Sequence, residues 1–231
     1  MRIALCFAGQ PRSFAKGFEY YKRNLFDHYE NVDVFFHTWI PADVNGLISL
    51  YQPKICLIEE PLKKNFDAIY TNNTHALRFP SRNVVSSFYS IFKASQLKKD
   101  YEQQNGFLYD WVIKTRFDYA LNACIPFSQF DSANMHIPDC HVWPNRDFGN
   151  DQFAFSSSEN MDKYMSTYGF IDEFVNAGVD MTGENMLSCN LKLHGLVGEN
   201  LVYVHMHNPF PPSELGGWGS LIRDDYEEWK P

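Results

Sequence analysis

The stretch that decides the fold reads Asp110-Trp111-Val112-Ile113-Lys114-Thr115-Arg116-Phe117-Asp118-Tyr119. Val112 and Ile113 form a short β-branched run, which predicts a buried strand. Beyond this run the chain places Arg116 and Asp118 two residues apart, at the carboxyl end of the strand. In open α/β sheets this is the end where ligands bind. A carboxylate there can hold a divalent cation, and the cation can hold a diphosphate. The alternative is a loop closed by a salt bridge.

Strand-like and helix-like segments alternate through the first half of the chain. Apolar or β-branched runs predict strands at 3–8, 32–37, 55–58 and 111–115. Apolar residues spaced three and four apart predict amphipathic helices at 14–29 and 84–101. In the second half we predict strands at 152–155 and 201–205 and helices at 158–168 and 184–194. Strand–helix–strand order of this kind predicts an α/β protein with a mixed, mostly parallel sheet flanked by helices.

Length, charge and cysteine usage argue against several classes of protein. The 231 residues, of which 45% are hydrophobic, predict one globular domain with a substantial core. No apolar run approaches the roughly 18 residues of a membrane span, and the first apolar run is too short for a signal peptide. A net charge of −8 argues against nonspecific binding to nucleic acid. Five scattered cysteines without a Cys-x-x-Cys spacing predict reduced thiols and a cytoplasmic location.

The turn after the first predicted strand is a candidate anion site. It reads Gly9-Gln10-Pro11-Arg12-Ser13-Phe14 and leads into a predicted helix. Gly9 permits close backbone approach, Ser13 can cap the helix, and the helix N-terminus offers N–H groups to an anion. Arg12 adds a donor fork suited to phosphate. The sequence is neither a Walker loop nor a dinucleotide-binding glycine fingerprint. The alternative is an ordinary strand-to-helix turn with a cap.

Three further polar clusters are candidates for catalysis or metal binding. Asp151 precedes a predicted strand, Glu184 begins a predicted helix, and His205 and His207 follow the last apolar run. Alternate residues of a strand point to the same side, so both imidazoles can face one metal ion. The alternatives are that Asp151 caps a turn, that Glu184 only complements the helix dipole, and that the two histidines hold no ligand.

Together these segments resemble the nucleotide-diphospho-sugar transferases of the GT-A fold, in particular small viral and bacterial capsule or lipopolysaccharide glycosyltransferases. The resemblance extends from Ile3 to Asn208 and rests on the order and spacing of its motifs. The motifs are Ala8-Gly9-Gln10-Pro11-Arg12, Val32-Asp33-Val34-Phe35-Phe36-His37-Thr38-Trp39, Trp111-Val112-Ile113-Lys114-Thr115-Arg116-Phe117-Asp118, Asn150-Asp151-Gln152-Phe153-Ala154-Phe155 and the pair His205 and His207. It implies a single GT-A-like domain, with a nucleotide-binding half at 1–118 and an acceptor and catalytic half at 119–231.

The resemblance also implies a reaction and its participants. The donor is a sugar linked to UDP or GDP, and the acceptor is a hydroxyl of a glycan or another molecule. The implied donor contacts are Ala8, Gly9, Gln10, Arg12, His37, Lys93, Arg116 and Asp118. Mn²⁺ or Mg²⁺ is implied on Asp118, with His207 or else His205 as a further ligand. Asp151 ranks ahead of Glu184 as the base that accepts the acceptor's proton.

One departure from the family pattern concerns the metal. The usual motif is Asp-x-Asp, whereas Arg116 stands here in place of the first carboxylate. Arg116 can contact the diphosphate directly, which reduces the need for a metal. Two other functions stay open. One is a sulfotransferase or nucleotidyltransferase that uses 9–12 as its phosphate loop, and the other is a non-catalytic relative that binds a nucleotide or a sugar.

Overall fold

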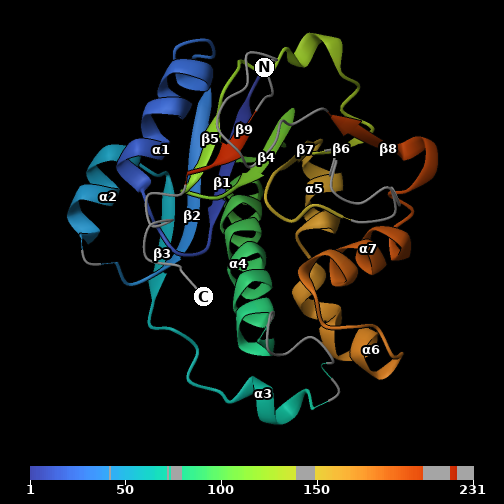
Figure 1. Ribbon diagram of the computed structural model, residues 1–231. Helices are drawn as coiled ribbons and strands as arrows, with labels where there is room; N and C mark the ends of the chain where they lie inside the picture. The colour runs from blue at the N-terminus through green and yellow to red at the C-terminus, as the bar shows by residue number, and fades with distance from the viewer. Residues whose placement is uncertain (42, 72, 74–79, 139–148, 205–218, 223–231) are drawn as a thin grey trace.

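A seven-stranded sheet with helices on both faces forms the centre of the protein (Figure 1). The computed structural model describes residues 1–41, 43–71, 73, 80–138, 149–204 and 219–222. The strands of the large sheet are β1 (Ile3–Ala8), β2 (Val32–Trp39), β3 (Ile55–Glu59), β4 (Trp111–Thr115), β6 (Met135–Pro138), β7 (Ala154–Ser156) and β8 (Leu201–Val204). A two-stranded sheet pairs β5 (Tyr119–Leu121) with β9 (Gly219–Leu221).

The strand order of the large sheet is β3-β2-β1-β4-β7-β6-β8. All neighbouring pairs are parallel except those of β7, which runs antiparallel to both β4 and β6. The predicted α/β class and the mixed, mostly parallel sheet are therefore confirmed. From β1 the chain builds outward through β2 to β3 and then returns to the other side of β1 as β4. The strand order thus reverses between β1 and β4, which creates a crevice at their carboxyl ends.

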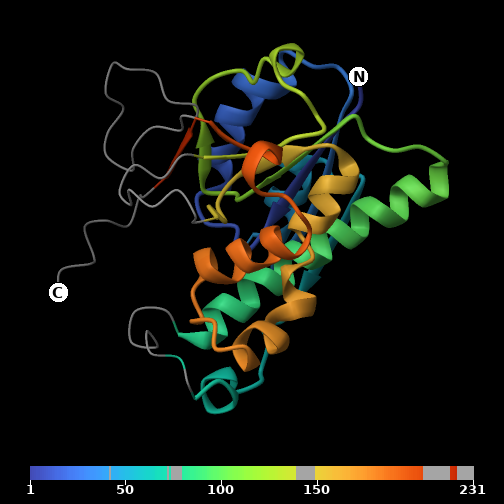
Figure 2. The same ribbon diagram turned by 90° about the vertical axis from the view of Figure 1, so that its right-hand side faces the viewer.

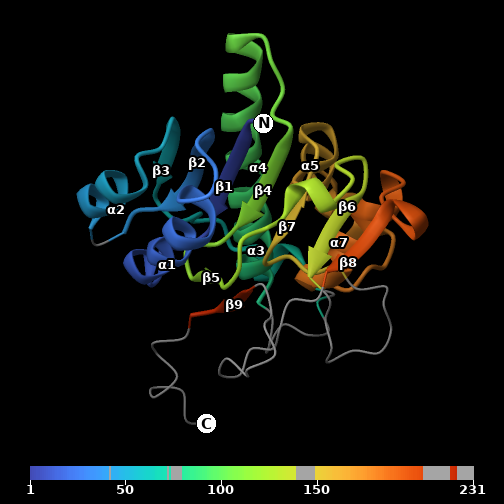
Figure 3. The same ribbon diagram turned by 90° about the horizontal axis from the view of Figure 1, so that it is seen from above.

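Alternating side chains on the central strands build two hydrophobic cores. Ile3, Leu5 and Phe7 of β1 face α1 (Phe14–Tyr21) and α2 (Val44–Tyr51). Ala4, Cys6 and Ala8 face the long helix α4 (Ser81–Asn105) and the helices of the second half. Those helices are α5 (Ser158–Tyr164), α6 (Ile171–Asn176) and α7 (Gly183–Leu193). Figure 2 shows them gathered along α4, and Figure 3 shows α1 and α4 on opposite sides of β1.

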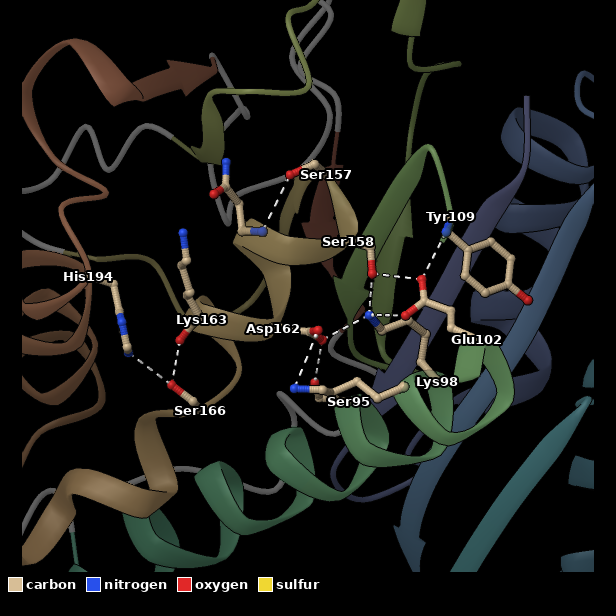
Figure 4. Close-up of polar contacts among 12 residues, drawn as sticks. Ser95, Lys98, Glu102, Tyr109, Ser157, Ser158, Asp162, Lys163, Ser166 and His194 are labelled. Atoms are coloured by element: carbon tan, nitrogen blue, oxygen red, sulfur yellow. Dashed lines mark hydrogen bonds and ion pairs between the residues drawn. The ribbon is translucent and has the colours of Figure 1, made fainter. Parts of the chain in front are cut away.

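A buried polar network holds the carboxyl-terminal half of α4 against α5 (Figure 4). Lys98 is fully buried, and its Nζ lies 2.8 Å from carboxylate oxygens of both Glu102 and Asp162. The Glu102 carboxylate also accepts hydrogen bonds from Ser158 Oγ (2.7 Å) and from the backbone N–H of Tyr109 (2.8 Å). Because each of these groups has a partner on another segment, the network fixes where α4 lies relative to α5 and to the chain entering β4.

Several predicted element boundaries differ from the structure, among them those of the helix predicted at 84–101, which is longer at both ends as α4. The helix predicted at 14–29 is α1, which ends at Tyr21 and continues as a π-helical turn over Lys22–Phe26. The helix predicted at 158–168 ends as α5 at Tyr164, and a separate 3₁₀ turn covers Thr167–Phe170. The strand predicted at 152–155 is β7, which begins two residues later. Among the described residues, no helix combines the length and apolar character needed to cross a membrane.

Candidate functional site

A cavity of about 300 Å³ lies at the carboxyl ends of β1 and β4, where the strand order reverses. The last residue of β1, Ala8, and the loop after it, with Gly9, Gln10 and Arg12, contribute to its wall. The end of β4 contributes Lys114 and Arg116, and Asp151 closes the wall from the segment before β7. The register explains why these segments meet, because Phe7 pairs with Thr115 and Ala8 pairs with His37. Residues that follow these pairs therefore emerge along one edge of the sheet.

Two other hollows in the described part of the chain lack this arrangement. One, of about 230 Å³, lies between α7 and β8, and Lys192 is the charged residue in its described wall. The other, of about 430 Å³, lies beside Lys99, Glu102 and Asp162 at the far end of α4. Neither lies at the carboxyl ends of β1 and β4, where open α/β sheets bind ligands. The cavity at β1 and β4 is therefore the candidate site.

The backbone of the loop after β1 is fixed from two sides. Gly9 has φ 102°, a conformation that favours glycine, and its N–H donates to Ser90 Oγ on α4 at 2.6 Å. Thr38 Oγ1 of β2 donates to the Gly9 carbonyl oxygen at 2.8 Å. The predicted cap at Ser13 is wrong, because Ser13 has a left-handed backbone (φ 48°) and its side chain makes no capping hydrogen bond to α1. The loop is thus held by α4 and β2.

His37 lies behind this loop rather than in the cavity wall. Its ring is fully buried, with Nε2 2.9 Å from Glu59 Oε2 and Nδ1 2.8 Å from Ser90 Oγ. Burial lowers the pKa of His37, and the hydrogen bond and charge of Glu59 act in the opposite direction. A carboxylate only accepts, so the neutral ring carries its proton on Nε2 and accepts from Ser90. His37 thereby orients the hydroxyl that holds Gly9.

Lys114 and Arg116 bring two positive charges to the β4 side of the cavity. Lys114 is 1% exposed, and its Nζ donates to the backbone carbonyl of Asp151. Burial lowers the pKa of Lys114 to about 8, an effect that the charge of Asp151 partly offsets. Arg116 Nε and Nη2 donate to the two carboxylate oxygens of Asp118, each at 2.7 Å. The loop after β4 is therefore closed by a salt bridge between Arg116 and Asp118, which was the alternative to a ligand site. The Arg116 side chain is nevertheless 33% exposed and lines the cavity.

The described residues do not form a metal site. Asp118 is 2% exposed, and both of its carboxylate oxygens accept from Arg116. Within the part of the chain that the structure describes, no three His, Cys, Asp or Glu side chains are grouped to hold a metal ion. His205 and His207 lie outside the described residues. Metal binding by Asp118 stays a prediction, and in this structure a metal ion has to displace Arg116 or share the carboxylate with it.

Asp151 lies against the first turn of α7, the turn that also carries Glu184. A Cβ added at Gly183 would lie 2.9 Å from Asp151 Oδ2, so the carboxylate sits against the first residue of this helix. Thr182 caps the helix by accepting from the N–H of Asn185 at 3.2 Å. The N-terminal end of a helix favours an ionised carboxylate. Asp151 lines the cavity and Glu184, the residue after Gly183, is half-buried on that turn.

A protein-family model matches the part of the chain that forms the cavity. Residues 1–210 match the model of a family described as a domain of unknown function, DUF7796. The chain belongs to the DUF7796 family. No curated protein matches the sequence. The matched span of this DUF7796 domain includes every described residue of the cavity wall, from Ala8 to Asp151.

Three residues of α4 and one of β2 line the DUF7796 cavity without having been predicted from the sequence. Asn83, Ser86 and Ser87 lie three and four residues apart on one side of the helix and line the cavity, as does Trp39 at the end of β2. The available signal was a cluster of small polar residues near the start of this amphipathic helix. The predicted contact Lys93 instead places its Nζ 5.4 Å from the centroid of the Tyr89 ring and is not among the described wall residues.

Proposed function

We propose that this protein is a GT-A-like glycosyltransferase, which moves a sugar from a UDP- or GDP-linked donor to a hydroxyl of a glycan or similar acceptor. The observation that carries the proposal is the convergence of Arg12, Lys114, Arg116 and Asp151 on one cavity at the reversal point of the strand order. Cations at such a crevice suit a phosphorylated ligand. A carboxylate beside them suits proton transfer in a reaction of that ligand.

The chemistry of glycosyl transfer uses both kinds of group. The bond between the anomeric carbon and the diphosphate oxygen breaks, and a bond forms from that carbon to the acceptor oxygen. Negative charge grows on the departing diphosphate, so fixed cations in the wall stabilise the transition state more than the ground state. The acceptor hydroxyl loses its proton, for which Asp151 is the base that this cavity offers. Glu184 is the second candidate for this role.

The proposal is tested by a donor panel. UDP- and GDP-linked sugars are compared with a sulfate donor and with nucleoside triphosphates, by calorimetry for binding and by release of nucleoside diphosphate for turnover. We expect binding and slow hydrolysis or transfer with a UDP- or GDP-sugar alone. Binding only of the sulfate donor or of triphosphates would contradict the proposal and favour a sulfotransferase or nucleotidyltransferase. If a nucleotide sugar binds but is not turned over with any acceptor tested, the result would favour a non-catalytic protein that binds nucleotides or sugars.

The role of Asp151 is tested separately. Asp151→Asn should keep donor affinity and lose several orders of magnitude in transfer rate, as for an interaction made in the transition state. Asp100→Asn, on the exposed side of α4, is the matched control and should leave both quantities unchanged. If Asp151→Asn loses donor binding but retains its rate at saturation, Asp151 holds donor hydroxyls and Glu184 becomes the base.

A further inference from the structure

We infer that the donor's diphosphate is neutralised by a set of protein cations, Arg12, Lys114 and Arg116, and that Asp118 positions Arg116 instead of holding a divalent ion. This inference rests on the proposed function and names the counter-charge of its substrate. It replaces the metal that the family resemblance implies with side chains present in the described structure.

The Asp118 carboxylate is already fully engaged by Arg116. Arg116 binds it in the two-pronged geometry that satisfies both of its oxygens, and the side chain is 3% exposed. A divalent ion on Asp118 must displace this guanidinium, or else stand beside it at a short distance from a like charge. Breaking a buried pair of this kind is costly because it leaves a charge without its partner.

The segment that bears the Arg116–Asp118 pair is held in place by its neighbours. The Phe117 ring is fully buried and stacks on Phe7, with 4.9 Å between ring centroids. The backbone of Gly17 on α1 lies so close to the Phe117 carbonyl that an added Cβ would collide with it. The N–H of Ile222, after β9, donates to the Asp118 carbonyl oxygen at 2.7 Å. Contacts from three segments thus hold the Arg116–Asp118 pair as it stands.

The charges around the cavity favour an anionic ligand. Its described wall carries three cations and one carboxylate, Asp151, and a second carboxylate, Asp118, is paired with Arg116, so three cations against two carboxylates leave a charge of +1. A nucleoside diphosphate sugar carries two negative charges on its diphosphate, so the excess positive charge of the described residues favours this ligand without a metal ion. Asp118 lies behind Arg116 and occupies two of the five N–H donors of the guanidinium, which leaves three to face a ligand.

The test compares ligands and metal conditions in calorimetry. Inorganic pyrophosphate, UDP and GDP are each titrated into the full chain in excess EDTA and in saturating Mn²⁺. We expect pyrophosphate and one nucleotide to bind with similar affinity in both conditions. Lys114→Met should weaken both ligands by about ten- to a hundredfold, the loss of one charge-assisted contact. Lys99→Met removes a cation that is 54% exposed on α4, away from the cavity, and should change neither affinity.

Asp118→Asn separates the two roles of that residue. As a positioning residue, its loss should weaken pyrophosphate binding equally in EDTA and in Mn²⁺, and Arg116→Lys should do the same because it removes the two-pronged pairing. As a metal ligand, its loss would abolish a Mn²⁺-dependent gain and leave binding in EDTA unchanged. Circular dichroism confirms that each variant is folded, and Lys114→Met keeps the inference testable if either of them is not.

The outcomes distinguish this inference from the proposed function. Nucleotide binding that requires Mn²⁺ overturns the inference and leaves the glycosyltransferase proposal intact. Pyrophosphate binding in EDTA without binding of either nucleotide supports the cation set and overturns the nucleotide-sugar donor. Absence of binding of all three ligands in both conditions overturns both.

Discussion

Replacing Gly17 by alanine should damage both the stability of the fold and the candidate site. Gly17 lies in α1, where its Cα faces the Phe117 carbonyl oxygen and the Tyr51 hydroxyl. A Cβ built there collides with that carbonyl, which is backbone and cannot rotate away. The substitution must therefore displace either α1 or the segment that carries Arg116 and Asp118.

The expected loss follows from two opposing terms. Overpacking of this kind costs about 1–3 kcal/mol, and an unyielding backbone partner places Gly17 at the upper end. Alanine in a helix gains about 1 kcal/mol over glycine. The net loss should be about 2 kcal/mol, or about 4–8 °C in Tm for a chain of this size. Because Arg116 moves with the segment, pyrophosphate affinity should also fall.

Thermal and urea unfolding of Gly17→Ala measure this loss, with Gly169→Ala as the control. Gly169 lies in the 3₁₀ turn Thr167–Phe170, and a Cβ added there meets nothing within 4 Å. Its replacement should leave Tm unchanged or raise it. A Gly17→Ala protein that is more stable than wild type, by about the 1 kcal/mol expected for an open helical site, would show that the close approach to Phe117 does not exist.

Three further predictions concern charge. Lys98→Ala should lower the free energy of unfolding, measured in urea, by about 3–5 kcal/mol because it leaves Glu102 and Asp162 without their buried partner. The control Lys99→Ala should change this free energy by less than about 0.5 kcal/mol. Because the pKa of His37 is lowered in the folded protein, the unfolded chain binds more protons, and the free energy of unfolding should fall as the pH drops below about 6.5. His37→Gln should make this fall with pH less steep. An unchanged dependence of the unfolding free energy on pH would contradict the neutral buried ring. Arg12→Ala should weaken nucleoside diphosphate binding about ten- to a hundredfold and hardly alter nucleoside binding; equal losses would make Arg12 structural.

The central strands and α4 were predictable because each is a long or clearly bounded apolar pattern. The runs at 3–8, 55–58 and 111–115 coincide with β1, β3 and β4 almost residue for residue. Elements with too few residues to show a period were missed, among them α2, β5 and β6. α1 ends early because the apolar spacing that continues to Tyr29 belongs to a π turn and a loop, whose residues also pack on the core.

The site was partly predictable for the same reason. Once β1 and β4 are recognised as neighbouring parallel strands, the residues after them must meet, and Gly9, Arg12 and Arg116 do line one cavity. Lys114 was missed because a lysine inside a strand has no sequence signal of its own. The structure shows which way the Lys114 side chain points. Val112 packs in the core on the α4 side of the sheet, Trp111 and Ile113 pack on the other side, and Lys114 lies on the same side as Val112 because side chains alternate along a strand.

The buried polar residues of α4 explain how these separate pieces are held to one geometry. Ser90 fixes Gly9 and His37 near the cavity. About two turns further along α4, Lys98 pairs with Asp162 of α5, and Glu102 accepts from the N–H of Tyr109 just before β4. Hydrogen bonds and ion pairs of this kind require a set geometry. A shift or rotation of α4 by one residue would therefore break them and leave buried polar groups without partners. The polar face at the start of α4 is therefore held at a set position opposite the cations of β4.

It follows that Ser90→Ala should weaken diphosphate binding, although Ser90 is not among the described wall residues. The substitution removes the hydroxyl that accepts from the Gly9 N–H, and the loop after β1 loses its attachment to α4. Gln96→Ala, on the exposed side of the same helix, is the control and should leave the affinity for pyrophosphate unchanged. Calorimetry on the two variants makes the comparison. Equal affinities would show that the loop keeps its shape without Ser90, and the geometry of the site would then rest on Thr38 and β2 alone.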